Sequence, residues 1–184
     1  MSTGSGKSLC FQLSILVNKD MYVDNIFNIK SRKFPIGIVI SPLIALMMDQ
    51  VNKLRSRNVE ARYYSCHTSK KEKMEIIKEI QSGKLDILYI TPETIFSKHN
   101  NIKMVLKELC HVTTFVIDEA QCIVTLGSSF RPLYFRLKDI INELGNPQIV
   151  ACTSPVSNSM RNIIMNNLKM NVNGTNIHVY TANR

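Results

Sequence analysis

The sequence lacks tryptophan and any apolar run long enough to cross a membrane. Met1-Ser2-Thr3-Gly4 does not resemble a secretory signal peptide. Five cysteines, at positions 10, 66, 110, 122 and 152, form no Cys-x-x-Cys pair. We therefore expect free thiols in a reducing compartment, most of them small core residues. Zinc ligands are usually spaced by two to four residues, so the adjacent pairs Cys66-His67 and Cys110-His111 do not indicate a zinc site.

Acidic residues are few, at 14 against 23 lysines and arginines, which gives a net charge of +9. This excess points to a polyanionic partner, although a basic surface that is merely solvated is the alternative. With 184 residues, 45% of them hydrophobic, the chain suits one domain with a sizeable core.

Strand-like and helix-like segments alternate along the chain. Strands are predicted at residues 36–40, 61–65, 85–90, 113–117, 148–152 and 177–180. Helices are predicted at residues 8–17, 43–57, 69–81, 102–109, 133–144 and 156–168, with an exposed loop or short helix at 18–33. The first helix is apolar nearly all round, so we expect it to be buried between a sheet and other elements. Ser41 followed by Pro42 is typical of a helix start. This alternation predicts an α/β fold: a parallel sheet with helices on both faces, and ligands bound outside the carboxyl ends of the strands.

The chain opens with a phosphate-binding pattern. Thr3, Gly4, Ser5, Gly6, Lys7 and Ser8 match the core of G-x-x-x-x-G-K-[ST], with Met1 in place of the first glycine. The glycines let backbone N–H groups form an anion nest, and the following helix adds its positive end. The pattern predicts that Lys7 reaches the terminal phosphates and that Ser8 holds Mg²⁺. A glycine- and serine-rich terminus that matches by chance is the alternative.

An acidic pair follows the apolar strand at 113–117. Asp118 is predicted to hold the same Mg²⁺ as Ser8, directly or through water. Glu119 is predicted to orient or deprotonate the water that attacks the phosphate. The alternative is a loop start whose carboxylates favour a helix N-terminus.

Together these motifs resemble the first RecA-like lobe of RecQ-family DNA helicases, in superfamily 2. The resemblance covers nearly the whole chain in the family's order and is carried by residues 3–13, 39–51, 89–93, 115–123, 127–134 and 178–184. It implies a RecA-like P-loop NTPase lobe over residues 1–184 and a 3′–5′ ATP-dependent DNA helicase activity. It also implies ATP and Mg²⁺ as cofactors, single-stranded or duplex DNA as partner, no membrane, and an intracellular location that is nuclear if the source is eukaryotic.

The same resemblance implies further site residues. Ser41, Pro42 and Thr91 would hold the backbone of single-stranded DNA, since hydroxyls and helix N-terminal amides contact phosphate without reading sequence. Taken locally, these residues are equally typical of helix starts. Arg131 would link DNA binding to the ATP site, with a surface salt bridge as the alternative. Gln121 would be a catalytic residue that takes over the coupling mediated by the family's histidine, whereas Thr153-Ser154-Pro155 stands where the family's motif joins ATP hydrolysis to strand separation.

Three segments depart from the family's pattern. Gln121 replaces the histidine of Asp-Glu-Ala-His but can still donate and accept hydrogen bonds. Leu126-Gly127-Ser128 replaces Trp-Gly-His, which removes a base-stacking platform worth about 1–3 kcal/mol. Thr153-Ser154-Pro155 replaces Thr-Ala-Thr, and Pro155 has no N–H to donate.

We also expect the strand before the P-loop and the second RecA-like lobe, with its arginine finger, to be absent from this chain. Turnover by the chain alone would then be slow, because ATP in such enzymes lies between two lobes. Two other functions compete with the helicase interpretation. One is a non-hydrolysing nucleotide- or nucleic-acid-binding remnant with a regulatory or scaffold role. The other is a small-molecule kinase or GTPase, which would leave residues 41–51 and 130–132 without a purpose.

Overall fold

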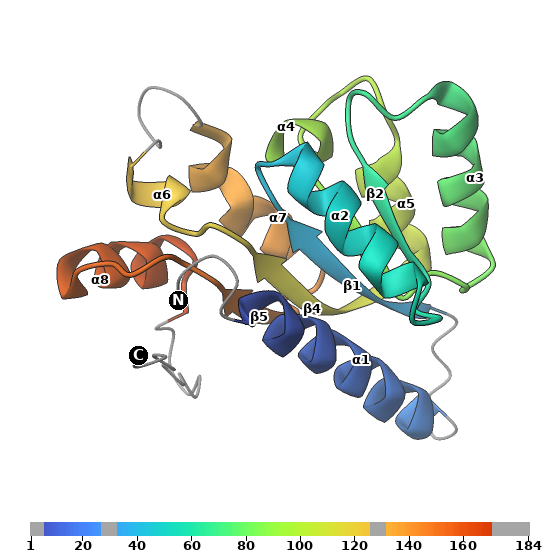
Figure 1. Cartoon of the computed structure of the whole chain (residues 1–184), viewed down its shortest axis with the longest axis horizontal. Coiled ribbons are helices and arrows are strands. Elements are labelled where there is room, and N and C mark those ends of the chain that lie inside the picture. The colour runs from blue at the N-terminus through green and yellow to red at the C-terminus, as the bar shows by residue number, and fades with distance from the viewer. Residues whose placement is uncertain (1–5, 27–32, 126–131, 171–184) are drawn as a thin grey trace.

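A computed structural model describes residues 6–26, 33–125 and 132–170. Within these ranges the strands form one parallel sheet in the order β2-β3-β1-β4-β5 (Figure 1). Their bounds are β1 Phe34–Ile40, β2 Ala61–Tyr64, β3 Ile87–Ile90, β4 Cys110–Ile117 and β5 Gln148–Ala151. The predicted parallel α/β fold is therefore confirmed, whereas the strand predicted at 177–180 lies outside the described residues.

Helices of very different length join the strands. They are α1 Lys7–Ile26, α2 Ile44–Arg55, α3 Lys70–Gln81, α4 Pro92–Ile95, α5 Ile102–Leu109, α6 Cys122–Thr125, α7 Leu137–Glu143 and α8 Asn158–Asn167, with a 3-10 helix η1 at Pro132–Arg136. The short helices α4 and α6 were not predicted. Within the described ranges no helix is long and apolar enough to cross a membrane.

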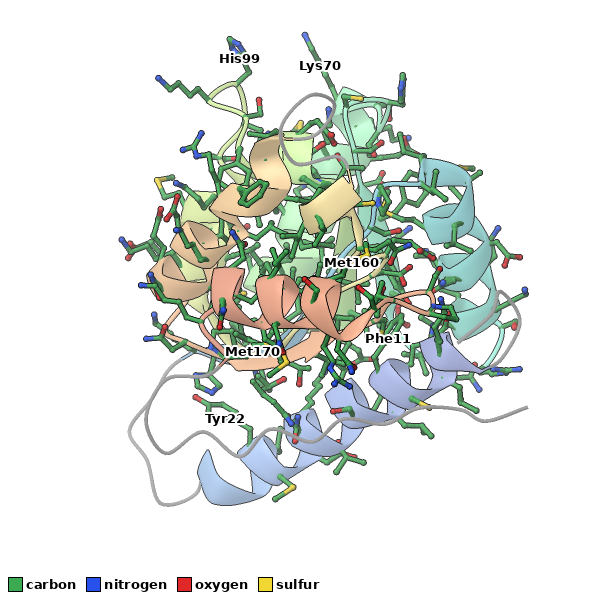
Figure 2. All side chains as sticks on the ribbon, turned by 90° about the vertical axis from the view of Figure 1, so that its left-hand side faces the viewer. Phe11, Tyr22, Lys70, His99, Met160 and Met170 are labelled. Carbon is green, nitrogen blue, oxygen red and sulfur yellow. The ribbon has the colours of Figure 1, made fainter. Side chains whose placement is uncertain are left out.

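Helices cover both faces of the sheet, as predicted. Side chains alternate along β1: Val39 belongs to a core cluster with residues of α1 and α2, whereas Ile38 belongs to a second cluster with residues of α3, α5, α7 and α8. Phe11 lies between α1 and the sheet (Figure 2). The two faces thus have separate apolar cores, and the core beneath α1 and α2 supports the helix that begins with Lys7 and Ser8.

Helix α1 differs from the prediction in length and burial. It continues to Ile26, into the stretch that was expected to be an exposed loop or a short helix. Ile15 is fully buried, but Leu9, Leu13 and Val17 are 51%, 52% and 53% exposed. The prediction that this helix is buried between the sheet and other elements is wrong, because α1 packs on the sheet through one side.

Helix α2 also begins later than predicted. Leu43 is its N-cap and has an extended backbone with φ of −115°, so Ser41 and Pro42 form the turn between β1 and α2. The backbone ladder continues into this turn, since the Ser41 amide donates to the Ile90 carbonyl at 3.2 Å. The carboxyl end of β1 is thereby held beside the end of β3.

The cysteines are all free thiols, as predicted. Cys110 and Cys122 are buried, whereas Cys10 and Cys66 are exposed and Cys152 is partly buried. The expectation that most of them are core residues therefore holds for only two of the five.

Candidate active site

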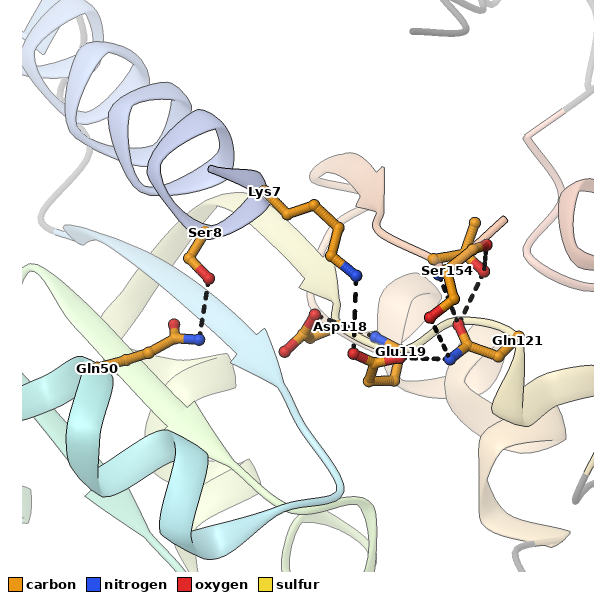
Figure 3. A network of polar contacts seen from close by, with 8 residues as sticks. Lys7, Ser8, Gln50, Asp118, Glu119, Gln121 and Ser154 are labelled. Carbon is orange, nitrogen blue, oxygen red and sulfur yellow. Dashed lines mark hydrogen bonds and ion pairs between the residues drawn. The ribbon is translucent and has the colours of Figure 1, made fainter. Parts of the chain in front are cut away.

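The first turn of α1 brings Lys7 to the carboxyl end of β4. Gly6 precedes the helix with φ of +81°, a left-handed backbone that glycine adopts without strain. Lys7 Nζ lies 3.8 Å from Glu119 Oε1 (Figure 3), and their side chains are only 12% and 23% exposed. Thr3, Gly4 and Ser5 lie outside the described residues, so their predicted part in the nest stays a prediction.

Asp118 is the buried acid of the site, with 4% of its surface exposed. Its amide donates to the Ile40 carbonyl at 2.9 Å, which fixes the end of β4 beside the end of β1. Burial and then the charge of Glu119 raise the pKa of Asp118 above its usual range. The Glu119 amide, Lys7 and the Ser41 hydroxyl act in the opposite direction but do not cancel this effect. A cation beside Asp118 would therefore relieve an unfavourable buried charge.

Glu119 has a backbone that sequence reasoning did not predict. Its φ is +53°, in the left-handed region, where a residue with a β-carbon costs about 1–2 kcal/mol. The turn is held by the Ala120 amide, which donates to the Cys152 carbonyl at 2.8 Å. Such strain is often found at functional sites. Here it accompanies the turn of the chain out of β4, after which the Glu119 carboxylate faces Lys7 (Figure 3).

Gln121 connects Glu119 with the segment that follows β5. Its Nε2 donates to the Glu119 carboxylate, and its Oε1 accepts from Thr153 Oγ1 at 2.8 Å and from the Ser154 amide at 3.3 Å. Both ends of the amide are therefore engaged (Figure 3). The glutamine that replaces the family's histidine still joins these two segments physically.

Ser8 lies on α1 one residue beyond Lys7, and its Oγ accepts a hydrogen bond from Gln50 Nε2 at 3.0 Å. A serine hydroxyl and a carboxylate are hard oxygen donors of the kind that Mg²⁺ prefers. Mg²⁺ usually takes one or two carboxylates and completes its shell with waters and phosphate oxygens. Ser8 and Asp118 fit this chemistry. Among the described residues, no group of three or more His, Cys, Asp or Glu side chains is placed to hold a metal ion by itself.

Two of the residues predicted to contact DNA are almost completely buried. Ser41 and Thr91 are 1% and 4% exposed. The Thr91 hydroxyl caps α4 by accepting from the Thr94 amide, which is the helix-start role left open by the sequence. Ser41 Oγ has no partner of hydrogen-bond geometry among the described residues, although it lies close enough to influence Asp118. Pro42 is partly buried, and Arg131 lies outside the described residues. Their contact with DNA stays a prediction.

Sequence reasoning gave no role to Gln12, Gln50 or Tyr89, which form a buried polar cluster behind Ser8. One signal was available for Gln50. It lies on the face of α2 that carries Met47 and Leu54, so a polar side chain interrupts an apolar stripe.

A parallel sheet with Lys7 and Ser8 at a helix N-terminus and Asp118-Glu119 at a neighbouring strand end is characteristic of the RecA-like lobe of a P-loop nucleoside triphosphatase. The chain belongs to the DEAD/DEAH box helicase family, which matches residues 1–163.

Relatives agree with this assignment and with the RecQ resemblance. The ATP-dependent helicase SGS1 of Saccharomyces cerevisiae is 33% identical over 195 residues, covering 100% of this chain and 13% of SGS1. The ATP-dependent DNA helicase RecQ of Synechocystis is 31% identical over 176 residues, covering 92% of this chain and 33% of that helicase. The chain thus spans a third or less of the length of these curated relatives.

A solved structure, that of the DUF1998 helicase MrfA bound to DNA and AMPPNP, matches the fold with a TM-score of 0.63. The match is 19% identical and covers 90% of this chain and 23% of that one. At this identity the likeness concerns the fold alone.

Proposed function

We propose that residues 1–184 are the ATP-binding lobe of a RecQ-like ATP-dependent DNA helicase, which works with a second RecA-like lobe or a partner chain. The observation that supports this most is the approach of Lys7 Nζ to within 3.8 Å of Glu119, beside the buried Asp118. DNA as partner fits the net charge of +9 and the name of the Synechocystis relative, a DNA helicase.

The chemistry follows from these side chains. Without nucleotide, Lys7 and Glu119 neutralise each other. A bound triphosphate attracts the Lys7 ammonium, which frees the Glu119 carboxylate to orient or deprotonate the attacking water. The amide of Gln121 holds that carboxylate in place from its other side. Mg²⁺ held by Ser8 and Asp118 would neutralise charge on the phosphate oxygens.

DNA would pass over the turns that follow β1 and β3. Because the hydroxyls of Ser41 and Thr91 are buried, we expect backbone amides and exposed neighbours of these residues to contact the phosphates. Arg131 would then connect this surface with the ATP site.

The test is ATP hydrolysis by the chain with and without single-stranded DNA, alone and with a second RecA-like lobe added. We expect slow hydrolysis by the chain alone and stimulation by DNA and the added lobe. Lys7→Ala and Glu119→Gln should abolish it, because they remove the phosphate contact and the base.

Matched controls are Lys53→Ala and Glu75→Gln, which change exposed residues of α2 and α3. Turnover that survives both site variants would exclude the assignment. DNA binding that weakens steeply with salt, without turnover under any condition, would instead select a non-hydrolysing remnant.

A further inference from the structure

A set of hydrogen bonds behind Ser8 joins α1, α2 and β3. Gln50 Nε2 donates to Ser8 Oγ at 3.0 Å (Figure 3). Gln50 Oε1 accepts from the Tyr89 hydroxyl at 2.9 Å and from Gln12 Nε2 at 3.3 Å. Gln12 Nε2 also donates to the Tyr89 hydroxyl at 2.9 Å. Gln50 is the member of this cluster that touches Ser8.

Packing alone does not explain these polar groups. Gln12, Gln50 and Tyr89 are 8%, 6% and 1% exposed. Burying an amide costs free energy that its hydrogen bonds only offset, so an apolar side chain of similar size would fill the same space at least as well. The amide of Gln50 therefore calls for a role beyond filling the core.

The structure gives each hydrogen bond of this cluster one direction. Tyr89 receives a hydrogen bond from Gln12 and has one hydrogen of its own, which must go to Gln50 Oε1. Reversing the Gln50 amide alone would set its NH₂ group against the NH₂ group of Gln12. With both amides oriented in this way, Gln50 Nε2 points at Ser8 and the Ser8 oxygen accepts.

Acceptance from Gln50 uses one of the two lone pairs of the Ser8 oxygen. The second lone pair and the hydroxyl hydrogen then remain for groups on the side away from Gln50. A metal ligand held in this way loses little rotational freedom when it binds.

We propose that Gln50 is a positioning residue that orients the Ser8 hydroxyl for a magnesium-bound nucleotide. The proposal rests on the proposed function, in which Ser8 holds Mg²⁺. Gln50 acts through Ser8 and touches neither the nucleotide nor the metal.

The experiment compares Gln50→Met with Gln12→Met by titrating a fluorescent ATP analogue with and without Mg²⁺. Both variants replace one buried amide of the same cluster with a thioether of similar shape, but only Gln50→Met removes the contact with Ser8. We expect Gln50→Met to weaken binding in Mg²⁺ about 10-fold while leaving metal-free binding unchanged. Gln12→Met should keep the Mg²⁺-dependent gain of the wild-type protein.

Urea unfolding of both variants separates this role from a general loss of stability. The proposal is overturned if Gln50→Met keeps the full gain, or if both variants lose it in proportion to their stability. If Gln50→Met does not fold, Gln50→Asn, which is one methylene shorter, should show the same loss of gain, and a normal gain would refute the proposal. A wild-type protein that binds the analogue without any gain from Mg²⁺ would refute the proposed metal site itself.

Discussion

Gly37→Ala should destabilise the protein and displace the helix that carries Lys7 and Ser8. Gly37 lies in β1 directly beneath Ile15 of α1. Ile15 is fully buried, and its β-branched side chain has little rotational freedom in a helix. A new methyl group at position 37 therefore cannot be accommodated by a side-chain rotation alone, and α1 has to move away from the sheet.

The expected magnitude follows from three distances. A β-carbon on Gly37 would lie 2.3 Å from Ile15 Cγ2, 2.8 Å from Cγ1 and 2.9 Å from Cδ1. Carbon atoms prefer separations of about 3.5–4.0 Å, so a shift of roughly 1 Å is needed. Overpacking of this kind costs about 1–3 kcal/mol. In a protein of this size each kcal/mol lowers the Tm by roughly 2–4 °C.

A double-mutant cycle measured by urea unfolding tests the cause. Ile15→Ala alone should cost about 2–5 kcal/mol, because it leaves a cavity. Combined with Gly37→Ala, it makes room for the new methyl group. The double variant should therefore cost at least about 1 kcal/mol less than the sum of the two single costs.

Ile15→Val is the matched control, since it keeps the Cγ1 and Cγ2 atoms that give the closest contacts. Ile15→Val should relieve little of the cost of Gly37→Ala. A Gly37→Ala protein as stable as the wild type, or costs that simply add in the Ile15→Ala cycle, would refute this account of how α1 is seated.

Two further predictions concern stability. Asp118→Asn should raise the free energy of unfolding at pH 7. Because the pKa of Asp118 is raised in the folded state, the unfolded state releases this proton at a lower pH. The stability of the wild-type protein therefore falls as the pH rises above 3.8, until the pKa of the folded state is passed. Urea unfolding from pH 3 to pH 8 checks this, and an advantage of the variant that shrinks with rising pH would contradict it. Ser69→Ala should cost about 0.5–2 kcal/mol, because the Ser69 hydroxyl and Glu72 form a capping box at the start of α3. Ser82→Ala, at the other end of α3, is its control, and equal costs would count against the cap.

The sequence was most informative where one local pattern decides the structure. The helix predicted at 102–109 has those bounds, because its apolar residues recur with helical spacing and Asn100 Oδ1 accepts from the Ile102 amide at 3.2 Å. The polar stretch after Val17 was misleading. Asn18 donates to Thr114 Oγ1 at 2.9 Å and Tyr22 stacks on His111 with ring centroids 4.1 Å apart. These contacts with β4 extend α1, and no local pattern contains them.

The same contrast holds in the site. The meeting of Lys7 with Glu119 was predictable, because a helix start and a strand end of a parallel sheet converge at one edge. The left-handed backbone of Glu119 was not, since it depends on a hydrogen bond from Ala120 to Cys152. The cluster around Gln50 was hidden for a similar reason: its hydrogen bonds join residues 38 to 77 positions apart.

The most direct test of a single magnesium-nucleotide site is a titration of ATP binding in Mg²⁺ by the wild-type protein, Lys7→Ala and Asp118→Asn. Lys7→Ala should weaken binding by roughly 10- to 100-fold, the equivalent of a hydrogen bond to a charged group. Asp118→Asn should lose the gain from Mg²⁺ but keep metal-free binding, and Lys53→Ala should behave as wild type. Wild-type binding of magnesium-ATP by both site variants would contradict the claim that the start of α1 and the end of β4 form one site.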